Sequence, residues 1–417
     1  MVATPLSPAP LPPTQKLYWT RPQDRAFTAT VTVVEGQRIA LDRTLFYPEG
    51  GGQSNDAGIL DWPGHTAQVT DVQKEKRNGE TIWHTLGGLL PAGGMPEVGT
   101  EVSGTLDWAR RYRHSQRHTA EHLLAQAFWR VNPAFGVRSV GMRGPECTLD
   151  LAGQPGESHV QAAQALLAGM LREGLHLETR IESAAGLDAY PLRRPPQVEG
   201  EVRVVLFRES GGAIWEASAC GGTHLPFGVQ AAPVVVLRTE RIKGDLTRVT
   251  FMAGEEATER LSSVYGQAQT LARGFSVGIE RLPERVADLQ AELSRTQADA
   301  QLLRRQLATG ILRQADWKAV LDGRVAFVET PDDLLLPVLE AAGSEPGRLT
   351  VVLAGNGRCG VASTLPEYPA QTLLHGWLAP SGGRGGGRSE LAQGQTERVA
   401  EFRHAVQDWL DALPLPE

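Results

Sequence analysis

The first hundred residues alternate apolar and polar side chains in short runs, a pattern typical of half-buried β-strands. Residues 1–15 precede the pattern and are rich in Pro, so we expect a flexible tail there. The β-rich runs are Phe27 to Val34, Arg38 to Leu41, Ala67 to Val72, Thr81 to Thr85 and Glu101 to Leu106. Because Gly, Pro, Asn and Asp separate these runs, as in a small barrel or sandwich, residues 16–107 are predicted to form an N-terminal β-barrel domain.

Between residues 108 and 254 the pattern mixes helical periods with strands. A long helix opens the region, and Ser158 to Glu173 has the spacing of a second, amphipathic helix. Val202 to Phe207 and Val234 to Thr239 are short, mostly apolar runs, which favour buried strands. We therefore expect residues 108–254 to form an α+β domain.

Two helical patterns follow, over Glu255 to Leu271 and Pro283 to Leu307, with the helix breaker Gly274-Phe275-Ser276-Val277-Gly278 between them. The second pattern has a mostly apolar seam that alternates steps of three and four: Ile279, Leu282, Val286, Leu289, Leu293, Thr296, Ala300, Leu303 and Leu307. This is the spacing of a coiled coil. An antiparallel hairpin and a homodimer both fit; because the breaker is short, we favour a helical hairpin over residues 255–310.

The last region, residues 311–417, has the pattern of a C-terminal α/β domain that can fold independently. Strands are predicted at Val325 to Val328, Leu349 to Leu353 and Gly360 to Thr364, and helices near Leu334, Leu373 and Val399. With the barrel, the α+β domain and the helical hairpin, this makes the whole chain α+β in class.

Composition places the chain among cytoplasmic globular proteins. Its 417 residues are enough for two to four domains. No apolar run reaches the roughly 18 residues that a membrane span needs, and the N-terminus has no signal pattern, so we expect no contact with a membrane. The three cysteines, Cys147, Cys220 and Cys359, lie far apart and do not form the framework of a disulfide-rich protein.

Charge is distributed unevenly along the chain. The formal net charge of −7 argues against general binding to nucleic acid. However, the region from Trp108 to Arg143 has a single acid, Glu121, against seven arginines, which we call the basic collar: Arg110, Arg111, Arg113, Arg117, Arg130, Arg138 and Arg143. A solvated face and a seat for phosphate groups both fit the collar; we favour the phosphate seat, with Arg117 as a candidate contact.

Two pairs of residues have the spacing of metal ligands. His118 and His122 lie four residues apart in the predicted long helix, so both project from one face and can bind one ion. About a hundred residues later, Cys220-Gly221-Gly222-Thr223-His224 repeats that spacing, with two Gly that allow a tight turn. A lone His on a helix is more often a core residue, but the two pairs together supply one sulfur and three nitrogens. We predict that the fold brings them together as a zinc site.

Two glycine-rich segments expose main-chain amides that a ligand can approach. The first is Thr44-Leu45-Phe46-Tyr47-Pro48-Glu49-Gly50-Gly51-Gly52-Gln53, in the barrel region. The second is Ser381-Gly382-Gly383-Arg384-Gly385-Gly386-Gly387-Arg388, between the last predicted helices, where Arg adds charge that suits phosphate or sugar contacts. From composition alone, a plain hairpin loop and a flexible solvent loop are the alternatives.

Taken together, these motifs resemble the editing and C-terminal portions of alanyl-tRNA synthetase. They are Thr44 to Gln53, the two metal-ligand pairs, and Gly382 to Arg388 followed by Leu391-Ala392-Gln393. The chain is most similar to the freestanding long form of the alanyl-tRNA editing proteins (AlaX type), and we expect no ATP-dependent aminoacylation core because too few residues precede Leu17. The resemblance implies a cytoplasmic zinc hydrolase that removes serine, and in some members glycine, from mischarged tRNA(Ala) and spares Ala-tRNA(Ala).

The resemblance also implies roles for individual residues. The implied zinc ligands are His118, His122, Cys220 and His224. The implied pocket residues are Thr44, which would contact the serine hydroxyl, and Gln53, Gly50, Gly51 and Gly52. The implied tRNA contacts in the C-terminal domain are Gly383, Arg384 and Arg388. Arg384 stands where a Lys is common in the family, which preserves the charge but not the shape.

Selection between serine and alanine has a physical basis in such a pocket. An apolar pocket rejects an added hydroxyl by only about a hundredfold. A group such as Thr44 that binds the serine hydroxyl is left unpaired when alanine enters, which discriminates more strongly. Two alternatives remain: a non-catalytic tRNA-binding module with structural zinc, and a zinc peptidase in which Glu121 of the pattern His-x-x-Glu-His is the general base.

Overall fold

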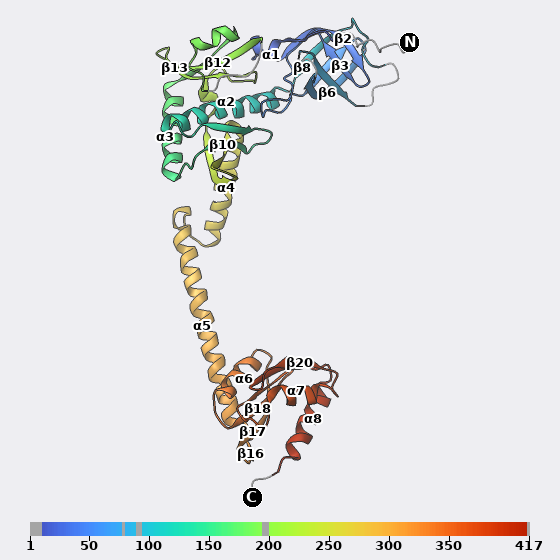
Figure 1. Cartoon of the computed structure of the whole chain (residues 1–417), viewed down its shortest axis with the longest axis vertical. Coiled ribbons are helices and arrows are strands. Elements are labelled where there is room, and N and C mark those ends of the chain that lie inside the picture. The colour runs from blue at the N-terminus through green and yellow to red at the C-terminus, as the bar shows by residue number, and fades with distance from the viewer. Residues whose placement is uncertain (1–10, 77–79, 89–93, 194–199, 415–417) are drawn as a thin grey trace, which may run out of the picture. The chain divides into compact units, whose positions relative to one another are not determined.

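The computed structural model describes residues 11–76, 80–88, 94–193 and 200–414 (Figure 1). The chain divides into two compact units, Met1–Ala268 and Gln269–Glu417. In the ranges described, no helix combines the length and the apolar composition needed to cross a membrane.

The first part of unit 1 is a closed barrel, as predicted. Its strands follow the order β2 (Ala26–Glu35), β3 (Arg38–Leu41), β7 (Ile82–Gly87), β6 (His65–Lys74), β5 (Gly58–Trp62) and β8 (Glu101–Leu106). Every predicted β-rich run became one of these strands, and only β5 was missed. Strand β8 shows why the pattern was informative: Val102, Gly104 and Leu106 are buried while the residues between them are exposed.

The chain joins the barrel earlier than predicted. Strand β1 (Gln15–Lys16) pairs in parallel with β4 (Arg43–Thr44), and helix α1 (Leu17–Thr20) follows at once. Thr14 is buried, and its hydroxyl donates a hydrogen bond of 2.8 Å to the carbonyl of Leu41. The C-terminal end of the predicted tail is therefore bound to the barrel, while residues 1–10 lie outside the described residues.

The rest of unit 1 is built around one long helix, α2 (Trp108–Val131), with a sheet on either side (Figure 1). The first sheet has the order β14 (Val234–Ile242), β15 (Leu246–Ala253), β10 (Cys147–Ala152) and β9 (Val137–Gly141). The second has the order β11 (Leu175–Ser183), β12 (Glu201–Glu209) and β13 (Ile214–Ala219). Helix α3 (Glu157–Glu173) packs on α2. The predicted helix 158–173 and strands 202–207 and 234–239 are all present.

Every residue of helix α2 from His114 to Phe128 is buried, which is unusual for a helix with so many polar residues. Its N-terminus is capped by Asp107, whose carboxylate accepts a hydrogen bond from the backbone N–H of Arg110. Leu123, Leu124 and Phe128 pack into the core shared with both sheets. Because the helix interior carries polar side chains into the core, each of them needs a partner there.

Helix α4 (Gly254–Gly274) contains the boundary between the two units, and α5 (Leu282–Gln314) follows a short 3-10 turn at Ile279–Arg281. The predicted breaker is confirmed, with Ser276 at a positive φ of 55°. The predicted packing of a helical hairpin is not confirmed, because Leu293, Leu303 and Leu307 of the seam are 58%, 58% and 56% exposed.

Unit 2 also contains a mixed sheet with the order β16 (Lys318–Val320), β17 (Gly323–Thr330), β18 (Arg348–Ala354), β19 (Arg358–Ser363), β21 (Leu391–Gln395) and β20 (Arg384–Gly387). Its other helices are α6 (Leu335–Gly343), α7 (Ala370–Leu378) and α8 (Val399–Asp411). All predicted strands and helices of this region are present. The flexible-loop alternative for residues 381–388 is wrong for β20, which is an edge strand antiparallel to β21.

Candidate metal centre

The four predicted ligands converge inside unit 1. The metal-binding atoms of His118, His122, Cys220 and His224 all lie within 4.8 Å of one another. The Cys220 sulfur lies 3.4 Å from Nε2 of His118 and 3.5 Å from Nε2 of His224. A tetrahedral zinc site with ordinary bond lengths places its ligand atoms about 3.3 to 3.8 Å apart. The donor set and these two spacings therefore fit zinc.

The turn that carries Cys220 and His224 leaves β13 and is fixed by buried contacts. The guanidinium of Arg203, on β12, donates to the carbonyls of Cys220 (3.1 Å) and Gly222 (2.7 Å). The indole of Trp19 donates to the carbonyl of Gly221 at 3.1 Å. A Cβ at Gly222 would lie 2.0 Å from Cε1 of His118, so only Gly allows the turn to approach helix α2 this closely.

Gln53 orients His118 from the barrel side. Its Oε1 lies 2.7 Å from Nδ1 of His118 and accepts a hydrogen bond of 3.2 Å from the backbone N–H of Thr223. Its Nε2 donates to the Thr223 hydroxyl at 2.9 Å, and Ser115 donates to the same hydroxyl. Because Gln53 accepts at Nδ1, Nε2 of His118 is left with a lone pair for a metal. Gln53, which was predicted to line the pocket, is instead buried outside the lining and contacts one of the predicted metal ligands.

The other two histidines have their own partners, as metal-binding imidazoles usually do. Nδ1 of His122 lies 3.3 Å from the carboxylate of Glu216, and Nδ1 of His224 lies 3.5 Å from the Thr119 hydroxyl. Glu216 is fully buried and is also paired with Arg193 at 3.0 Å. Sequence reasoning missed Glu216 and Thr119, because nothing in their local pattern shows which histidine they will face.

The electrostatics of the cluster favour an ionised thiol. Burial raises the pKa of Cys220, but its interactions with His118 and His122 outweigh burial, so the pKa lies well below its usual value. Burial and the charges of the same two residues lower the pKa of His224 to about 3. A thiolate at Cys220 and a neutral imidazole at His224 are the protonation states in which these two side chains bind a metal. Burial lowers the pKa of His122, but Glu216 and Cys220 outweigh it and raise that pKa well above its usual value, so a metal must displace a proton from His122.

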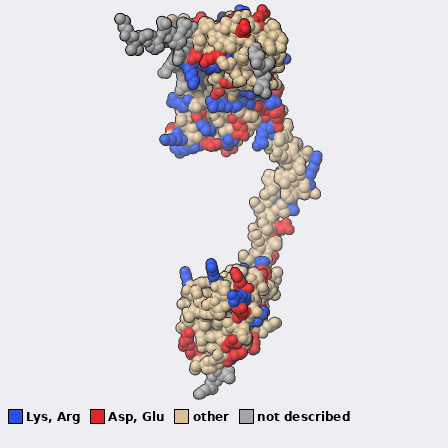
Figure 2. Space-filling model, turned by 90° about the vertical axis from the view of Figure 1, so that its right-hand side faces the viewer, with Lys and Arg blue, Asp and Glu red and all other residues tan. Residues whose placement is uncertain are grey.

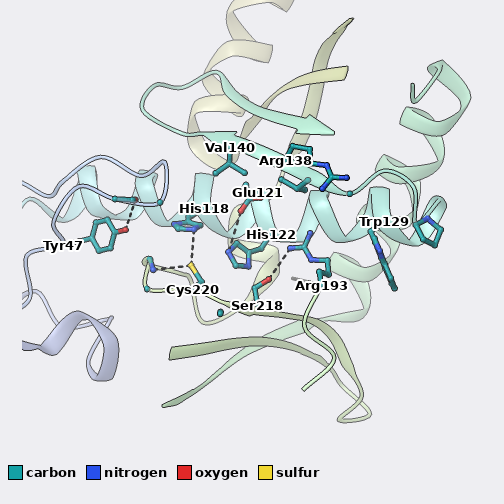
Figure 3. Close-up of a pocket in the computed structure, with 18 of the residues that line it drawn as sticks. Tyr47, His118, Glu121, His122, Trp129, Arg138, Val140, Arg193, Ser218 and Cys220 are labelled. Carbon is teal, nitrogen blue, oxygen red and sulfur yellow. Dashed lines mark hydrogen bonds and ion pairs between the residues drawn. The ribbon is translucent and has the colours of Figure 1, made fainter. Parts of the chain in front are cut away.

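A pocket of about 1290 Å³ opens onto the cluster (Figure 3). Tyr47 lies at one end and Trp129 at the other, with His118, His122 and Cys220 between them. Its barrel end is lined by Tyr47, Gly50, Gly51 and Lys74. The C-terminal end of α2 and the segment after it, including the start of β9, contribute Trp129, Pro133, Ala134, Gly136, Val137 and Arg138 to the lining. The carboxylate of Glu121 also faces the pocket, 3.6 Å from Nε2 of His122.

Only some of the predicted pocket residues of the barrel line the pocket. Gly50 and Gly51 line the pocket, and Gly51 and Gly52 have positive φ values of 56° and 82°, which Gly adopts without strain. Thr44 is completely buried and is not among the lining residues. Its hydroxyl accepts from the backbone N–H of Phe46 at 3.0 Å and lies 2.9 Å from Nε2 of His84.

The basic collar does not form one continuous seat for phosphate groups. Arg117 is buried, and its guanidinium binds both carboxylate oxygens of Glu256 at 2.6 and 2.7 Å, so it does not face the pocket. Arg111 is buried against Asp56. Of these arginines only Arg138 lines the pocket. On the face of unit 1 that Figure 2 shows, basic and acidic side chains are interspersed.

The remaining collar residues are engaged near the surface. Arg113 pairs with Glu255 and Glu259, Arg143 pairs with Glu49, Arg110 donates to the Asn55 carbonyl and Arg130 donates to the Trp215 carbonyl. For Arg113 and Arg143, whose ion pairs lie at the surface, the phosphate seat stays a prediction.

The predicted contacts of the C-terminal region lie in unit 2. Arg384 is the first residue of strand β20 and Arg388 follows its last, and both are exposed. In the part of the chain that the structure describes, neither guanidinium has an ion-pair partner. Gly383 precedes the strand, and a Cβ there would lie 2.5 Å from Leu378, so this position requires Gly for packing.

Comparisons with known sequences find relatives among the tRNA synthetases. The family model for class II (A) tRNA synthetases matches residues 15–110. An alanine–tRNA ligase of Pyrococcus abyssi is 30% identical over 420 residues, which cover 97% of this chain and 44% of that ligase. The ligase of Thermococcus kodakarensis is 31% identical over 421 residues, covering 95% of this chain and 43% of that ligase.

One solved structure, the C-Ala domain from Aquifex aeolicus alanyl-tRNA synthetase, covers 24% of this chain and 97% of that domain, at 17% identity and a TM-score of 0.22. The chain spans less than half the length of the two ligases that it matches.

Proposed function

Because this chain is a relative of the alanyl-tRNA synthetases, as its motifs predicted, we propose that it hydrolyses tRNA(Ala) mischarged with serine, and also with glycine, while sparing Ala-tRNA(Ala). The observation that carries the proposal is the convergence of His118, His122, Cys220 and His224 beside a pocket of about 1290 Å³. In this proposal the chain is a zinc-dependent aminoacyl-tRNA deacylase that needs no ATP.

The ester in an aminoacyl-tRNA is already activated, so the enzyme must chiefly position it beside a water molecule. Gly50 and Gly51 from the barrel and Gly221 and Gly222 from the ligand turn line the pocket together with His118. Their lack of side chains lets a ribose and an aminoacyl group lie close to the main chain. Zinc held by the four ligands would supply positive charge that stabilises the charge developing on the ester.

Recognition of the serine hydroxyl is assigned to Thr44 in our proposal. Nδ1 of His84 lies 3.4 Å from the Ile39 carbonyl, and burial lowers the pKa of His84 to about 4, so the ring is neutral near pH 7. Because Nδ1 donates to the Ile39 carbonyl, Nε2 accepts a hydrogen bond from the Thr44 hydroxyl. The Thr44 oxygen then has one lone pair left, since Phe46 uses the other.

Thr44→Val tests this assignment and Thr44→Ser is its matched control. Because Thr44 does not line the pocket in this structure, a serine hydroxyl reaches it only if the barrel end opens. We expect Thr44→Val to lower the ratio of the Ser-tRNA to the Ala-tRNA deacylation rate and Thr44→Ser to keep it. An unchanged ratio in Thr44→Val would place Thr44 in the barrel core instead.

The body of the tRNA is assigned to unit 2 in our proposal. Arg384 and Arg388 are exposed on a glycine-rich edge strand, where phosphate oxygens can approach both the side chains and the backbone amides. Replacing both with Gln should reduce the dependence of tRNA binding on salt concentration, because fewer counterions are released.

Two other functions are compatible with the same metal site. A non-catalytic module would bind mischarged tRNA and leave its ester intact, which a closed site with four protein ligands would favour. A peptidase would use Glu121, which faces the pocket beside His122. A peptide-cleavage assay of the wild-type protein and of Glu121→Gln separates the second alternative from ours.

The decisive experiment measures single-turnover deacylation of tRNA(Ala) charged with serine, glycine or alanine by the zinc-loaded full chain. We expect rapid loss of serine, loss of glycine, and retention of alanine. Equal rates for all three would defeat the proposed selectivity. Binding of Ser-tRNA(Ala) without any increase in its hydrolysis would establish the non-catalytic alternative.

A further inference from the structure

The pocket extends well beyond the metal ligands, to an exposed tryptophan on the same helix. Trp129 follows His122 by seven residues on α2, so it lies two turns further along nearly the same face, about 10 Å along the helix axis. It lines the pocket and is 39% exposed, although it is among the largest apolar side chains. Figure 3 shows it at the end of the pocket opposite Tyr47.

Arg130, the next residue along α2, forms with Trp215 the kind of contact by which an arginine and a tryptophan stabilise a fold. Arg130 stacks on the Trp215 ring at 5.2 Å and donates to the Trp215 carbonyl at 2.9 Å. Trp129 has no ring or cation contact of this kind with any residue that the structure describes. Arg138, on β9, lines the same end of the pocket and is exposed.

Arg138 differs from the rest of the basic collar. Across residues 11–76, 80–88, 94–193 and 200–414, its guanidinium has no hydrogen bond and no ion pair. The only carboxylate among the described lining residues is that of Glu121, beside His122. The Trp129 end of the pocket therefore combines an open indole face with an unneutralised positive charge.

This combination favours one class of ligand. An exposed indole stacks on any unpaired nucleobase, and a nearby guanidinium binds the phosphate of the same strand. A purely apolar ligand would cover Trp129 but leave Arg138 unpaired, and an isolated carboxylate or phosphate would use Arg138 but leave the indole open. Single-stranded nucleic acid satisfies both groups at once.

We propose that Trp129 and Arg138 form a subsite for an unpaired nucleobase and its phosphate at the 3′ end of the RNA. The base stacks on the indole of Trp129, and the guanidinium of Arg138 binds the phosphate that precedes the terminal ribose. The subsite rests on the proposed function. In that function the ester lies at the cluster of His118, His122, Cys220 and His224, and the terminal base then lies about two helical turns away, at Trp129.

The test uses an RNA without an amino acid, so that binding is measured separately from hydrolysis. A single-stranded tetranucleotide ending in CCA carries 2-aminopurine in place of its terminal adenine, and stacking quenches its fluorescence. We expect the full-length wild-type protein to quench this probe. Trp129→Ala should raise the dissociation constant roughly 5- to 150-fold, the range measured for removal of one stacking aromatic residue.

Three further variants make the outcome specific. Trp129→Phe keeps a smaller aromatic face and should recover part of the quenching. Phe227→Ala removes another exposed aromatic residue of unit 1, one outside the pocket, and should bind the probe as the wild-type protein does. Arg138→Gln should weaken binding and reduce the slope of log affinity against log salt by about 0.7.

The failures of the subsite and of the proposed function can be distinguished. If Trp129→Ala binds and quenches the probe like the wild-type protein, the subsite is overturned, even when serine is still removed from tRNA. If the wild-type protein removes no serine but its quenching depends on Trp129, the deacylase proposal fails and the subsite stands. Circular dichroism of Trp129→Ala verifies that the variant is folded.

Discussion

Replacing Gln53 with Ala is the sharpest test of how the barrel serves the metal centre. The side chain accepts at 2.7 Å from the His118 ring and at 3.2 Å from the Thr223 backbone, and donates at 2.9 Å to the Thr223 hydroxyl. Loss of a partner that orients a metal-binding His typically weakens metal binding 10- to 100-fold. We expect Gln53→Ala to raise the zinc dissociation constant by that factor, or about 1.4 to 2.7 kcal/mol.

The assay is competition for zinc against a chromophoric chelator at pH 7. Gln53→Glu is the matched control: it keeps the length of the side chain and an acceptor for His118, so its affinity should stay near that of the wild-type protein. Thermal unfolding of the metal-free proteins reports separately on the lost hydrogen bonds. An unchanged zinc affinity in Gln53→Ala would refute the role of Gln53 in orienting His118.

Three further predictions address other parts of unit 1. Cys220→Ala should lose bound zinc in elemental analysis, and Cys359→Ala should retain it; full retention in both would show that the ligand set is wrong. Burial lowers the pKa of His84 to about 4 in the folded state, whereas His84 of the unfolded chain takes up a proton below about pH 6.5. The free energy of unfolding, measured by urea titration, should therefore fall by about 3 kcal/mol as the pH is lowered from 6.5 to 4. A fall of equal size in His84→Gln would exclude His84 as the cause. Asp56→Ala leaves the buried charge of Arg111 unpaired and should destabilise the protein by about 3 to 5 kcal/mol at pH 7, whereas unchanged stability would show that the pair is not needed.

Hydrophobic periodicity predicted those elements whose burial follows a regular pattern along the chain. The alternation in Glu101–Leu106 and the apolar run in Val202–Phe207 correspond to strands with the predicted faces in the core. Strand β5 was missed because Gly58 and Asp61 interrupt its short apolar pattern. Strand β20 was missed because three of its four residues are Gly and only its hydrogen bonds to β21 define it.

The metal ligands could be predicted because their spacing is local. His118 and His122 share a helix face, and Cys220 and His224 share a turn. The fate of the basic collar could not be predicted, because charge density does not reveal pairing. Glu256, which neutralises Arg117, lies 139 positions along the chain. Only the fold decides which arginines remain free for a ligand.

The placement of Gln53 and Asp56 changes the meaning of the predicted boundary at residue 107. Both precede that boundary, yet each bonds a side chain of α2: Gln53 accepts from His118, and the Asp56 carboxylate accepts from Arg111 at 2.9 and 3.0 Å. A fragment of residues 108–254 would leave the buried charge of Arg111 unpaired and His118 without its orienting acceptor. The barrel is therefore part of the metal centre rather than an appendage, and this explains why a single pocket extends from its glycine turn to the far end of α2.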